Sequence, residues 1–335
     1  MSTPDDTLRT IRSPAPHGLG AAGGAYTALA DLINLRFAAR ELSLAPPPRV
    51  RQPLAGHVAS RVRGRGMDFA EVRRYESGDD VRAMDWRVTA RTGKPHTKLF
   101  QEDKERPVFL VVDQTTPMFF GSERAFKSVA AAETAALIAW TALERGDRVG
   151  GIVFDDAAHR EVRPRRGKRA VLRLLGAVHD ANVRLPVRTE PTGEAEAIAG
   201  RARLADALEA ARRTARHGAL AVVISDFTTL DARAFRHLQQ LGRGTELVGI
   251  RIADRYEREL PPPDTYTITD GTIRTRIDTR SAQARDRFVS AARDLHETQA
   301  EAFARARATL IELGTGEEPV ATLGDRLRAM LGART

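Results

Sequence analysis

The sequence predicts an α/β protein in which a small β-rich unit precedes a doubly wound, mostly parallel sheet. Three features carry this prediction: apolar runs that end in aspartate, helical patterns that alternate with them, and a glycine-punctuated segment ahead of them. A continuous apolar run of about five residues is typical of a strand buried on both faces, and alternation with helices is typical of parallel sheets. With 335 residues, of which 42% are hydrophobic, the chain can bury one large core and a smaller one.

The part of the chain before the parallel sheet divides in two. Residues 1–48 form a helical leader and linker, in which apolar residues at helical spacing predict a helix over 29–42 that consecutive prolines end. Residues 49–106 hold short segments between glycines, with Val88 expected to face Thr97 across a turn. This pattern predicts a small β-rich domain.

Residues 107–335 carry the alternating pattern that predicts the larger domain. Val108 to Val112 is a continuous apolar run, and it predicts the first buried strand. Asp270-Gly271 lies between two alternating segments and predicts a β-hairpin over 265–278. The other expected elements are strands over 149–154, 221–224 and 247–252 and helices over 126–140, 204–216, 232–241, 282–310 and 320–331.

Composition excludes several kinds of site. The chain has no cysteine, which excludes disulfides, thiolate metal ligands, iron-sulfur clusters and thiol catalysis. Lys168 lacks the upstream glycine of a phosphate-binding P-loop, and no two histidines have the i, i+4 spacing of a zinc-binding helix. No stretch of about 18 apolar residues occurs, and Asp5 and Asp6 stand where a signal peptide is basic. We therefore expect no membrane span and a cytoplasmic protein.

The net charge is only weak support for a polyanionic partner. The chain's 53 Lys and Arg exceed its 44 Asp and Glu to give +9, but acidic residues accompany the arginines along most of the chain. The densest basic run lies within residues 160–173. It favours a solvated face, and the alternatives are a site for phosphate, an acidic partner or nucleic acid. Few aromatic residues lie near this run to stack on bases, which disfavours nucleic acid.

Two predicted strands end in carboxylates that suit a metal ion. Asp113 follows the first strand, and Asp226 follows the strand over 221–224. In an open α/β sheet the carboxyl ends of the strands form the ligand site, so these side chains should lie close together. With the hydroxyl of Thr115 they predict a Mg²⁺ site, since Mg²⁺ binds one or two carboxylates and keeps several waters. The alternative is that both aspartates cap the helices that follow.

A second cluster, within residues 64–91, alternates arginine with aspartate around a tryptophan. Arginine binds carboxylates in a bidentate geometry, so the cluster predicts either a salt-bridge lattice that holds the small domain together or a docking surface. We expect a buried tryptophan here, whose replacement destabilises the small domain. The central members of the cluster are Asp79, Asp80, Arg82, Asp85, Trp86 and Arg87.

A family hallmark extends from Gly64 to Met118. The chain reads GRGMDF, then YESGDDVRAMDWRVTAR, then VVDQTTPM. This resembles the domain-of-unknown-function family fifty-eight, whose usual form runs from G-x-G-x-E-F through Y-x-x-G-D-D-x-R-x-I-D-W to D-x-S-x-S-M. The resemblance is looser at 224–227, 254–261 and 313–331. It implies a von Willebrand factor A-like domain joined to a small β-rich domain, in proteins typically encoded beside AAA+ ATPases of the MoxR type.

The resemblance also implies a metal-ion-dependent adhesion site, which this chain carries in a degenerate form. Such a site uses D-x-S-x-S, a threonine from a later loop and an aspartate after a further strand. Asp113, Thr115 and Asp226 fit this pattern, whereas Pro117 and Ala202 stand where two hydroxyl ligands belong. Because water can replace a ligand of Mg²⁺, we expect metal binding to be weakened rather than abolished.

The resemblance implies a non-enzymatic adaptor that acts with a MoxR-type AAA+ ATPase in a chaperone-like assembly, with other von Willebrand A-like proteins as further partners. One alternative is a Mg²⁺-dependent phosphoryl-transfer hydrolase that uses Asp113 and Asp226. Phosphatases with a D-x-D-x-T motif use their second acid to protonate the leaving group, which Thr115 cannot do. The other alternative is a nucleic-acid-binding protein that uses the run at 160–173.

Overall fold

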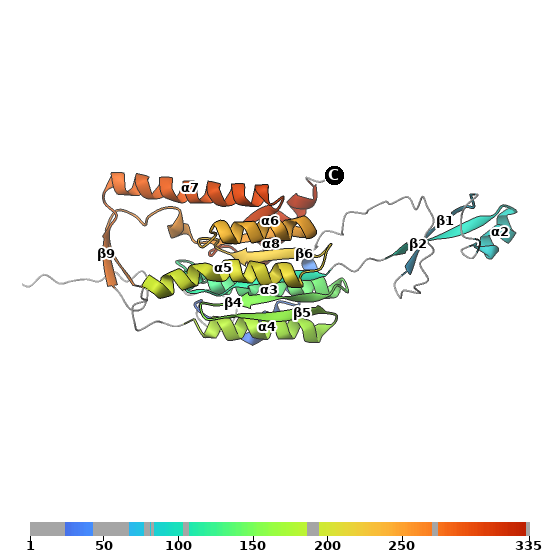
Figure 1. Cartoon of the computed structure of the whole chain (residues 1–335), viewed down its shortest axis with the longest axis horizontal. Coiled ribbons are helices and arrows are strands. Elements are labelled where there is room, and N and C mark those ends of the chain that lie inside the picture. Colours follow the sequence, from blue (N-terminus) through green and yellow to red (C-terminus); the bar gives the residue numbers. More distant parts are fainter. Residues whose placement is uncertain are drawn as a thin grey trace, which may run out of the picture. The chain divides into compact units, whose positions relative to one another are not determined.

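The chain folds into two compact units, described by a computed structural model. One unit comprises Pro47–Glu105, and the other comprises Met1–Pro46 together with Arg106–Thr335. Figure 1 draws the elements of both units. Among the residues that the structure describes, no helix is both long and apolar enough to cross a lipid bilayer. The described residues are 24–42, 67–76, 81, 84–102, 107–185, 194–269 and 274–332.

A six-stranded sheet forms the centre of the larger unit. Its strand order is β10-β7-β6-β3-β4-β5, and β5 alone runs antiparallel to its neighbour. The interior strands are continuous apolar runs because helices cover both faces of the sheet. This confirms the predicted mostly parallel sheet. Its strands are β3 (Val108–Asp113), β4 (Val149–Phe154), β5 (His159–Arg165), β6 (Leu220–Ser225), β7 (Glu246–Ala253) and β10 (Thr309–Gly314).

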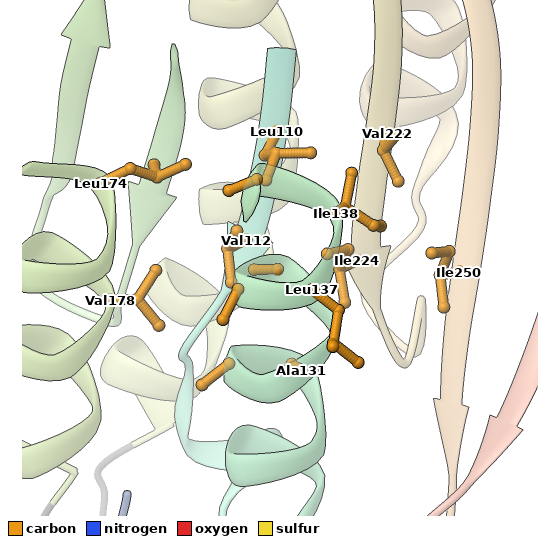
Figure 2. Packing of buried hydrophobic residues seen from close by; sticks show 14 of the residues in the cluster. Leu110, Val112, Ala131, Leu137, Ile138, Leu174, Val178, Val222, Ile224 and Ile250 are labelled. Atoms are coloured by element: carbon orange, nitrogen blue, oxygen red, sulfur yellow. The ribbon is translucent and has the colours of Figure 1, made fainter. Parts of the chain in front are cut away.

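Helices lie on the two faces of this sheet over separate core clusters. Successive side chains of β3 point to opposite faces, so Leu110 and Val112 enter one cluster while Phe109 and Val111 enter the other. Figure 2 shows α3 lying over the cluster that contains Leu110 and Val112. The helices over this first cluster are α3 (Lys127–Glu144), α4 (Lys168–Val183) and α8 (Pro319–Gly332), and those over the second are α5 (Glu194–Thr214), α6 (Ala232–Gly244) and α7 (Ala282–Arg305).

The described residues of the leader pack on the first core cluster as two short elements. These are α1 (Leu29–Asn34) and the 3-10 turn η1 (Ala38–Glu41), so the prediction of one helix over 29–42 is wrong. Side chains of α3 satisfy carbonyl oxygens along this path. Trp140 Nε1 donates to the oxygen of Leu32 at 2.9 Å, and Thr141 Oγ1 donates to the oxygen of Ala39 at 3.2 Å. The chain can therefore follow α3 without continuous helical hydrogen bonds.

The helix predicted over 282–310 is wrong at its C-terminal end. It stops at Arg305, Arg307 adopts a φ of 56°, and the following residues form β10. β10 pairs in parallel with β7, which places Leu313 beside Ile252. A short apolar run fits a buried helix or a buried strand equally well, and here pairing with β7 selects the strand.

Each unit also contains a two-stranded antiparallel sheet. In the larger unit β8 (Thr265–Thr269) pairs with β9 (Arg274–Asp278), as predicted, while the expected turn residues Asp270 and Gly271 lie outside the described residues. In the smaller unit β1 (Met67–Arg74) pairs with β2 (His96–Glu102). Between them lies a helix, α2 (Trp86–Thr92), which contains Val88. The prediction that Val88 faces Thr97 from a strand is therefore wrong.

We expect Gly249→Ala to destabilise the larger unit by about 1–3 kcal/mol. A β-carbon at Gly249, on β7, would lie 2.2 Å from Cε1 of Phe303. The Phe303 ring is fully buried in the second core cluster, so it has no room to move aside. Chemical denaturation measures the loss.

Gly176→Ala is the matched control for this substitution. A β-carbon at Gly176, on α4, meets nothing within 4 Å, and alanine favours a helix interior over glycine by about 1 kcal/mol. This variant should gain stability. A Gly249→Ala variant as stable as the unsubstituted protein would contradict the close approach of Phe303 to β7.

Candidate functional site

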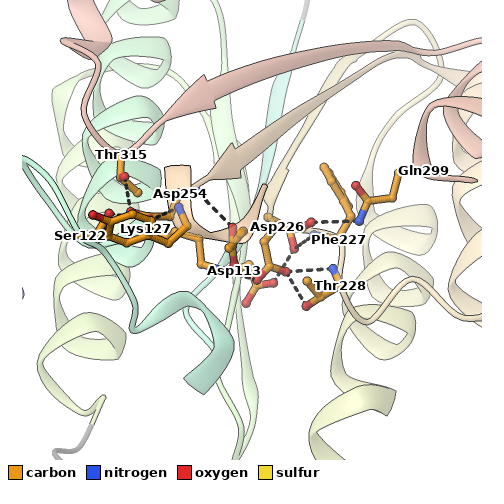
Figure 3. A network of polar contacts seen from close by, with 12 residues as sticks. Asp113, Ser122, Lys127, Asp226, Phe227, Thr228, Asp254, Gln299 and Thr315 are labelled. Carbon is orange, nitrogen blue, oxygen red and sulfur yellow. Dashed lines mark hydrogen bonds and ion pairs between the residues drawn. The ribbon is translucent and has the colours of Figure 1, made fainter. Parts of the chain in front are cut away.

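The carboxyl ends of β3 and β6 bring the two predicted aspartates together (Figure 3). Asp113 ends β3 and Asp226 follows β6, and their exposed fractions are 1% and 3%. Asp113 Oδ1 accepts from the backbone N–H and the hydroxyl of Thr115 at 2.9 and 2.6 Å. Its Oδ2 accepts from the hydroxyl of Ser225 at 2.6 Å. Both oxygens of Asp113 are thus engaged by neighbouring groups of the chain.

Asp226 is held from two sides. Its Oδ1 accepts from the backbone N–H and the hydroxyl of Thr228 at 2.9 and 2.8 Å. Its Oδ2 accepts from Nζ of Lys127 at 2.7 Å, and the same ammonium pairs with Oε1 of Glu257. Lys127 is 1% exposed. A buried cation therefore lies between two carboxylates at the end of β6.

A third strand end contributes the carboxylate of Asp254. This residue follows β7, is fully buried and caps a 3-10 turn that ends at Glu257. Its side chain accepts from the hydroxyls of Ser122 and Thr315 at 2.7 and 2.6 Å. Its backbone N–H donates to Oε2 of Glu257 at 3.0 Å, which leaves Oε1 of Glu257 to face Lys127. Asp254 thereby orients the second acidic partner of the lysine.

Burial and neighbouring charges shift the pKa values of this site in opposite directions. Burial, and then the charge of Asp226, raise the pKa of Asp113 to about 7, although hydrogen bonds from Ser225 and Thr115 oppose the shift. Burial also acts to raise the pKa of Asp226, but the ammonium of Lys127 outweighs it and the net pKa is lowered. Burial acts to lower the pKa of Lys127, and its carboxylate partners overcome this and raise it. Lys127 and Asp226 thus form a charged pair beside a carboxyl that holds its proton up to near-neutral pH.

This donor set does not fit a Mg²⁺ ion held by Asp113, Thr115 and Asp226. Mg²⁺ demands oxygen ligands in a near-octahedral arrangement, and those carboxylates must be free to coordinate it. Here Nζ of Lys127 already donates to Oδ2 of Asp226, and Oδ1 of the same carboxylate accepts from the backbone N–H and the hydroxyl of Thr228. Across the described ranges, no three carboxylate or imidazole side chains are grouped so that they could hold a metal ion.

The alternative that the two aspartates cap the following helices is wrong. Phe126 precedes α3 and makes no side-chain cap, and Asp231 is the side chain that caps α6. Asp113 and Asp226 instead accept from the backbone two residues further along, which closes a local turn at each strand end. The two aspartates therefore shape the loops of the site rather than the helix starts.

The positions that depart from the family pattern lie beside this site. Pro117 is part of a 3-10 turn, η3 (Thr116–Met118), which begins three residues after the end of β3. Thr116 donates its backbone N–H and hydroxyl to Oδ2 of Asp156 at 3.0 and 2.5 Å, so its hydroxyl does not replace the missing ligand at Pro117. Ala202 belongs to α5, and its side chain lies outside the described residues.

Sequence reasoning missed Lys127, Asp254 and Glu257. A signal existed for Lys127, because it is a single lysine at the start of a long apolar helix, in a chain with few lysines. A signal existed for Asp254 as well, since it directly follows an apolar strand in the same way as Asp113 and Asp226. Glu257 carried no signal of its own, because its place depends on the turn that Asp254 caps.

The arginine–aspartate cluster of the smaller unit is only partly described. Asp85 caps α2, where its Oδ1 accepts from the backbone N–H groups of Arg87 and Val88 at 3.0 and 3.1 Å. Trp86 is 66% exposed, so the expectation of a buried tryptophan is wrong. The helix that it begins, α2, contains no buried residue. Outside the described residues lie Asp79, Asp80 and Arg82.

The basic run at 160–173 lies on β5 and α4, two elements that the sequence did not predict. β5 is an edge strand, and among the residues that the structure describes no strand pairs with its outer side. Most of its residues are polar and exposed, so the sequence lacks the apolar pattern that would predict a strand here. Between β5 and α4 lies a groove with a volume of about 780 Å³, which we call the arginine groove. Its charged lining consists of Arg160, Glu161, Arg163, Arg165, Arg173 and Asp180.

Ion pairs engage only part of this lining. Arg160 pairs with Asp180 at 2.8 Å, and Arg163 lies 3.8 Å from Glu161. Within the described part of the chain, Arg165 and Arg173 have no acidic partner, and both are exposed. The groove therefore presents uncompensated positive charge beside a free strand edge.

The sheet order, with one antiparallel edge strand and helices on both faces, defines a von Willebrand factor A-like α/β protein. The chain belongs to the family described as Protein of unknown function DUF58, whose family model matches residues 71–298. The predicted family is thus confirmed. The chain is also 32% identical, over 241 residues, to uncharacterized proteins of Mycobacterium tuberculosis and Mycobacterium bovis, and the match covers 72% of this chain and 72% of each relative.

The solved structures that the chain matches are more distant in sequence. The conserved hypothetical protein BatB from Bacteroides thetaiotaomicron is 12% identical with a TM-score of 0.37, over 68% of this chain and 99% of that chain. An aerotolerance-related membrane protein from Bacteroides fragilis is 15% identical with a TM-score of 0.37, over 67% and 100%. A von Willebrand factor type A protein from Catenulispora acidiphila is 14% identical with a TM-score of 0.32, over 70% and 43%.

The raised pKa of Asp113 predicts that Asp113→Asn stabilises the protein more at high pH than at low pH. The unfolded carboxyl ionises near its ordinary value of 3.8, whereas the folded one ionises near 7, so the native carboxyl costs stability as pH rises through this window. Asparagine does not ionise and removes this cost. Thermal unfolding at pH 5 and pH 8 measures the difference in Tm between variant and parent. An equal difference at both pH values would contradict the raised pKa.

We expect Asp85→Ala to lose about 1 kcal/mol of local stability in α2, because the amides of Arg87 and Val88 lose their acceptor. Trp86→Ala should change stability by less than about 0.5 kcal/mol, since its ring is mostly exposed. Hydrogen exchange of the α2 amides reports both. Faster exchange in the Trp86 variant than in the Asp85 variant would contradict these roles.

Proposed function

We propose that this protein is a non-enzymatic adaptor that docks on a MoxR-type AAA+ ATPase in a chaperone-like assembly, in the cytoplasm. The observation that carries the proposal is the arginine groove, an exposed and positively charged surface at a free edge of the sheet. The resemblance in the segment from Gly64 to Met118 points to the ATPase, because such proteins are typically encoded beside one.

An adaptor role is favoured over a phosphoryl-transfer hydrolase by the state of the strand-end carboxylates. A nucleophilic carboxylate must reach its substrate, and a second acid must protonate the leaving group. Asp113 is 1% exposed, and Asp226 is paired with Lys127. Thr115 stands where such a hydrolase carries its second acid.

The partner segment that suits the arginine groove is acidic and extended. Carboxylates complement Arg165 and Arg173, and an extended segment can add to the free edge of β5 through backbone hydrogen bonds. Pro164 lacks an N–H, so such pairing would be confined to the first part of β5. The lining of the groove contains two acidic side chains and no aromatic ring, which favours a protein partner over nucleic acid.

We expect the purified chain to capture a MoxR-type AAA+ ATPase, and Arg165→Glu/Arg173→Glu to weaken that complex by about tenfold or more. Arg236→Glu/Arg287→Glu is the matched control, because it places the same charge change on exposed residues of α6 and α7. Affinity is measured by biolayer interferometry at two salt concentrations, with and without nucleotide.

Three results would count against the proposal. The first is the absence of a complex under every nucleotide and Mg²⁺ condition. The second is Mg²⁺-dependent turnover of p-nitrophenyl phosphate that Asp113→Asn abolishes, which would favour the hydrolase. The third is binding of single-stranded DNA at low salt that the groove variant alone loses, which would favour a nucleic-acid-binding protein.

A further inference from the structure

We propose that Lys127 is a built-in cation that takes the place of a divalent metal at the carboxyl edge of the sheet, so that this edge is complete without a metal ion. The inference does not depend on the identity of any partner. It rests on the position of the ammonium, on the cost of placing it there and on the groups that hold it (Figure 3).

The ammonium lies against one of the two strand-end carboxylates that a metal at this edge would need. Asp226 is the carboxylate that follows the second of the two central strands, and its Oδ2 lies 2.7 Å from Nζ of Lys127. The remaining oxygen of Asp226 is taken by Thr228. A metal ion at this carboxylate would therefore have to displace either the lysine or the loop that contains Thr228.

A lysine at position 127 costs free energy unless the carboxylates around it require a positive charge. Lys127 is the first residue of α3, where the helix dipole is positive and disfavours a cation. Its side chain is 2% exposed, so the charge is also removed from water. The helix itself gains nothing from a lysine here. Two carboxylates, 99 and 130 residues away in the sequence, provide the compensation.

The chain also holds both carboxylates in place around the ammonium. Asp254 orients Glu257 through its backbone N–H, and Ser122 and Thr315 anchor Asp254 in turn. Gln299 Nε2 donates to the backbone oxygen of Asp226 at 3.2 Å, which holds the other carboxylate from α7. These contacts come from several elements that meet at one edge of the sheet, so the cation site is preorganised.

Lysine is the suitable cation for such a site. It carries its charge on a compact ammonium, whereas the planar fork of arginine needs more room. Only five of the 53 basic residues in this chain are lysine, so composition does not account for its presence here. An internal ammonium also offers no open coordination position, so a partner's carboxylate cannot bind this edge as it would bind a metal.

Mn²⁺ titration followed by electron paramagnetic resonance tests the proposal with the full chain. We expect no saturable Mn²⁺ binding by the parent protein at the Asp226 site. Lys127→Ala removes the ammonium and leaves room, so it should gain one saturable site, at least about tenfold tighter than any binding by the parent. Lys127→Ala/Asp226→Asn should lose that site again. If Asp226→Asn leaves some Mn²⁺ binding unchanged, that Mn²⁺ is bound at a different site.

Saturable binding by the parent that Asp226→Asn abolishes would overturn the proposal, as would a folded Lys127→Ala variant that gains no site. If Lys127→Ala fails to fold, a second pair of variants tests the proposal. Lys127→Met should lower Tm strongly because it leaves Asp226 and Glu257 uncompensated, and Lys127→Met/Asp226→Asn should recover part of that loss. No recovery in the double variant would also overturn the proposal, because the lysine would then not be neutralising Asp226.

Discussion

The ion pair between Lys127 and Asp226 is the interaction on which the carboxyl end of this sheet depends. A charge that is removed from water is tolerated only with a close partner, and removal of one member of a buried pair typically costs about 3–5 kcal/mol. Glu257 shares the ammonium, and Asp254 positions Glu257. The loops after β6 and β7 and the start of α3 are therefore arranged around one positive charge.

This arrangement separates a closed end of the sheet from an open edge. At the closed end, the carboxylates of Asp113, Asp226 and Asp254 accept hydrogen bonds from groups of the chain itself. At the open edge, no described strand pairs with the outer side of β5, and arginines of β5 and α4 line the arginine groove. An α/β sheet usually binds ligands at its carboxyl end. Here internal compensation at that end leaves the arginine groove as the more accessible charged surface.

Most of the α/β core could be predicted because its signals are local. The apolar runs of β3, β4, β6 and β7 are short and end in polar residues, so each fits a buried strand. Prediction was wrong where the outcome depends on distant contacts. β10 is a strand because it pairs with β7, and β5 is a strand although its side chains are polar, because β4 supplies its hydrogen bonds. Trp86 is 66% exposed and begins a helix with no buried residue, which no local pattern indicates.

The sequence alone shows that Asp113 and Asp226 each follow an apolar strand, and parallel pairing of β3 with β6 brings those strand ends together. It also determined the family, through a dense motif. What neutralises Asp226 follows from packing between distant parts of the chain. Lys127 and Glu257 lie far from Asp226 along the chain, and the packing of α3 and the turn after β7 brings them together. Electrostatic compensation depends on distance in space, and sequence spacing does not record that distance.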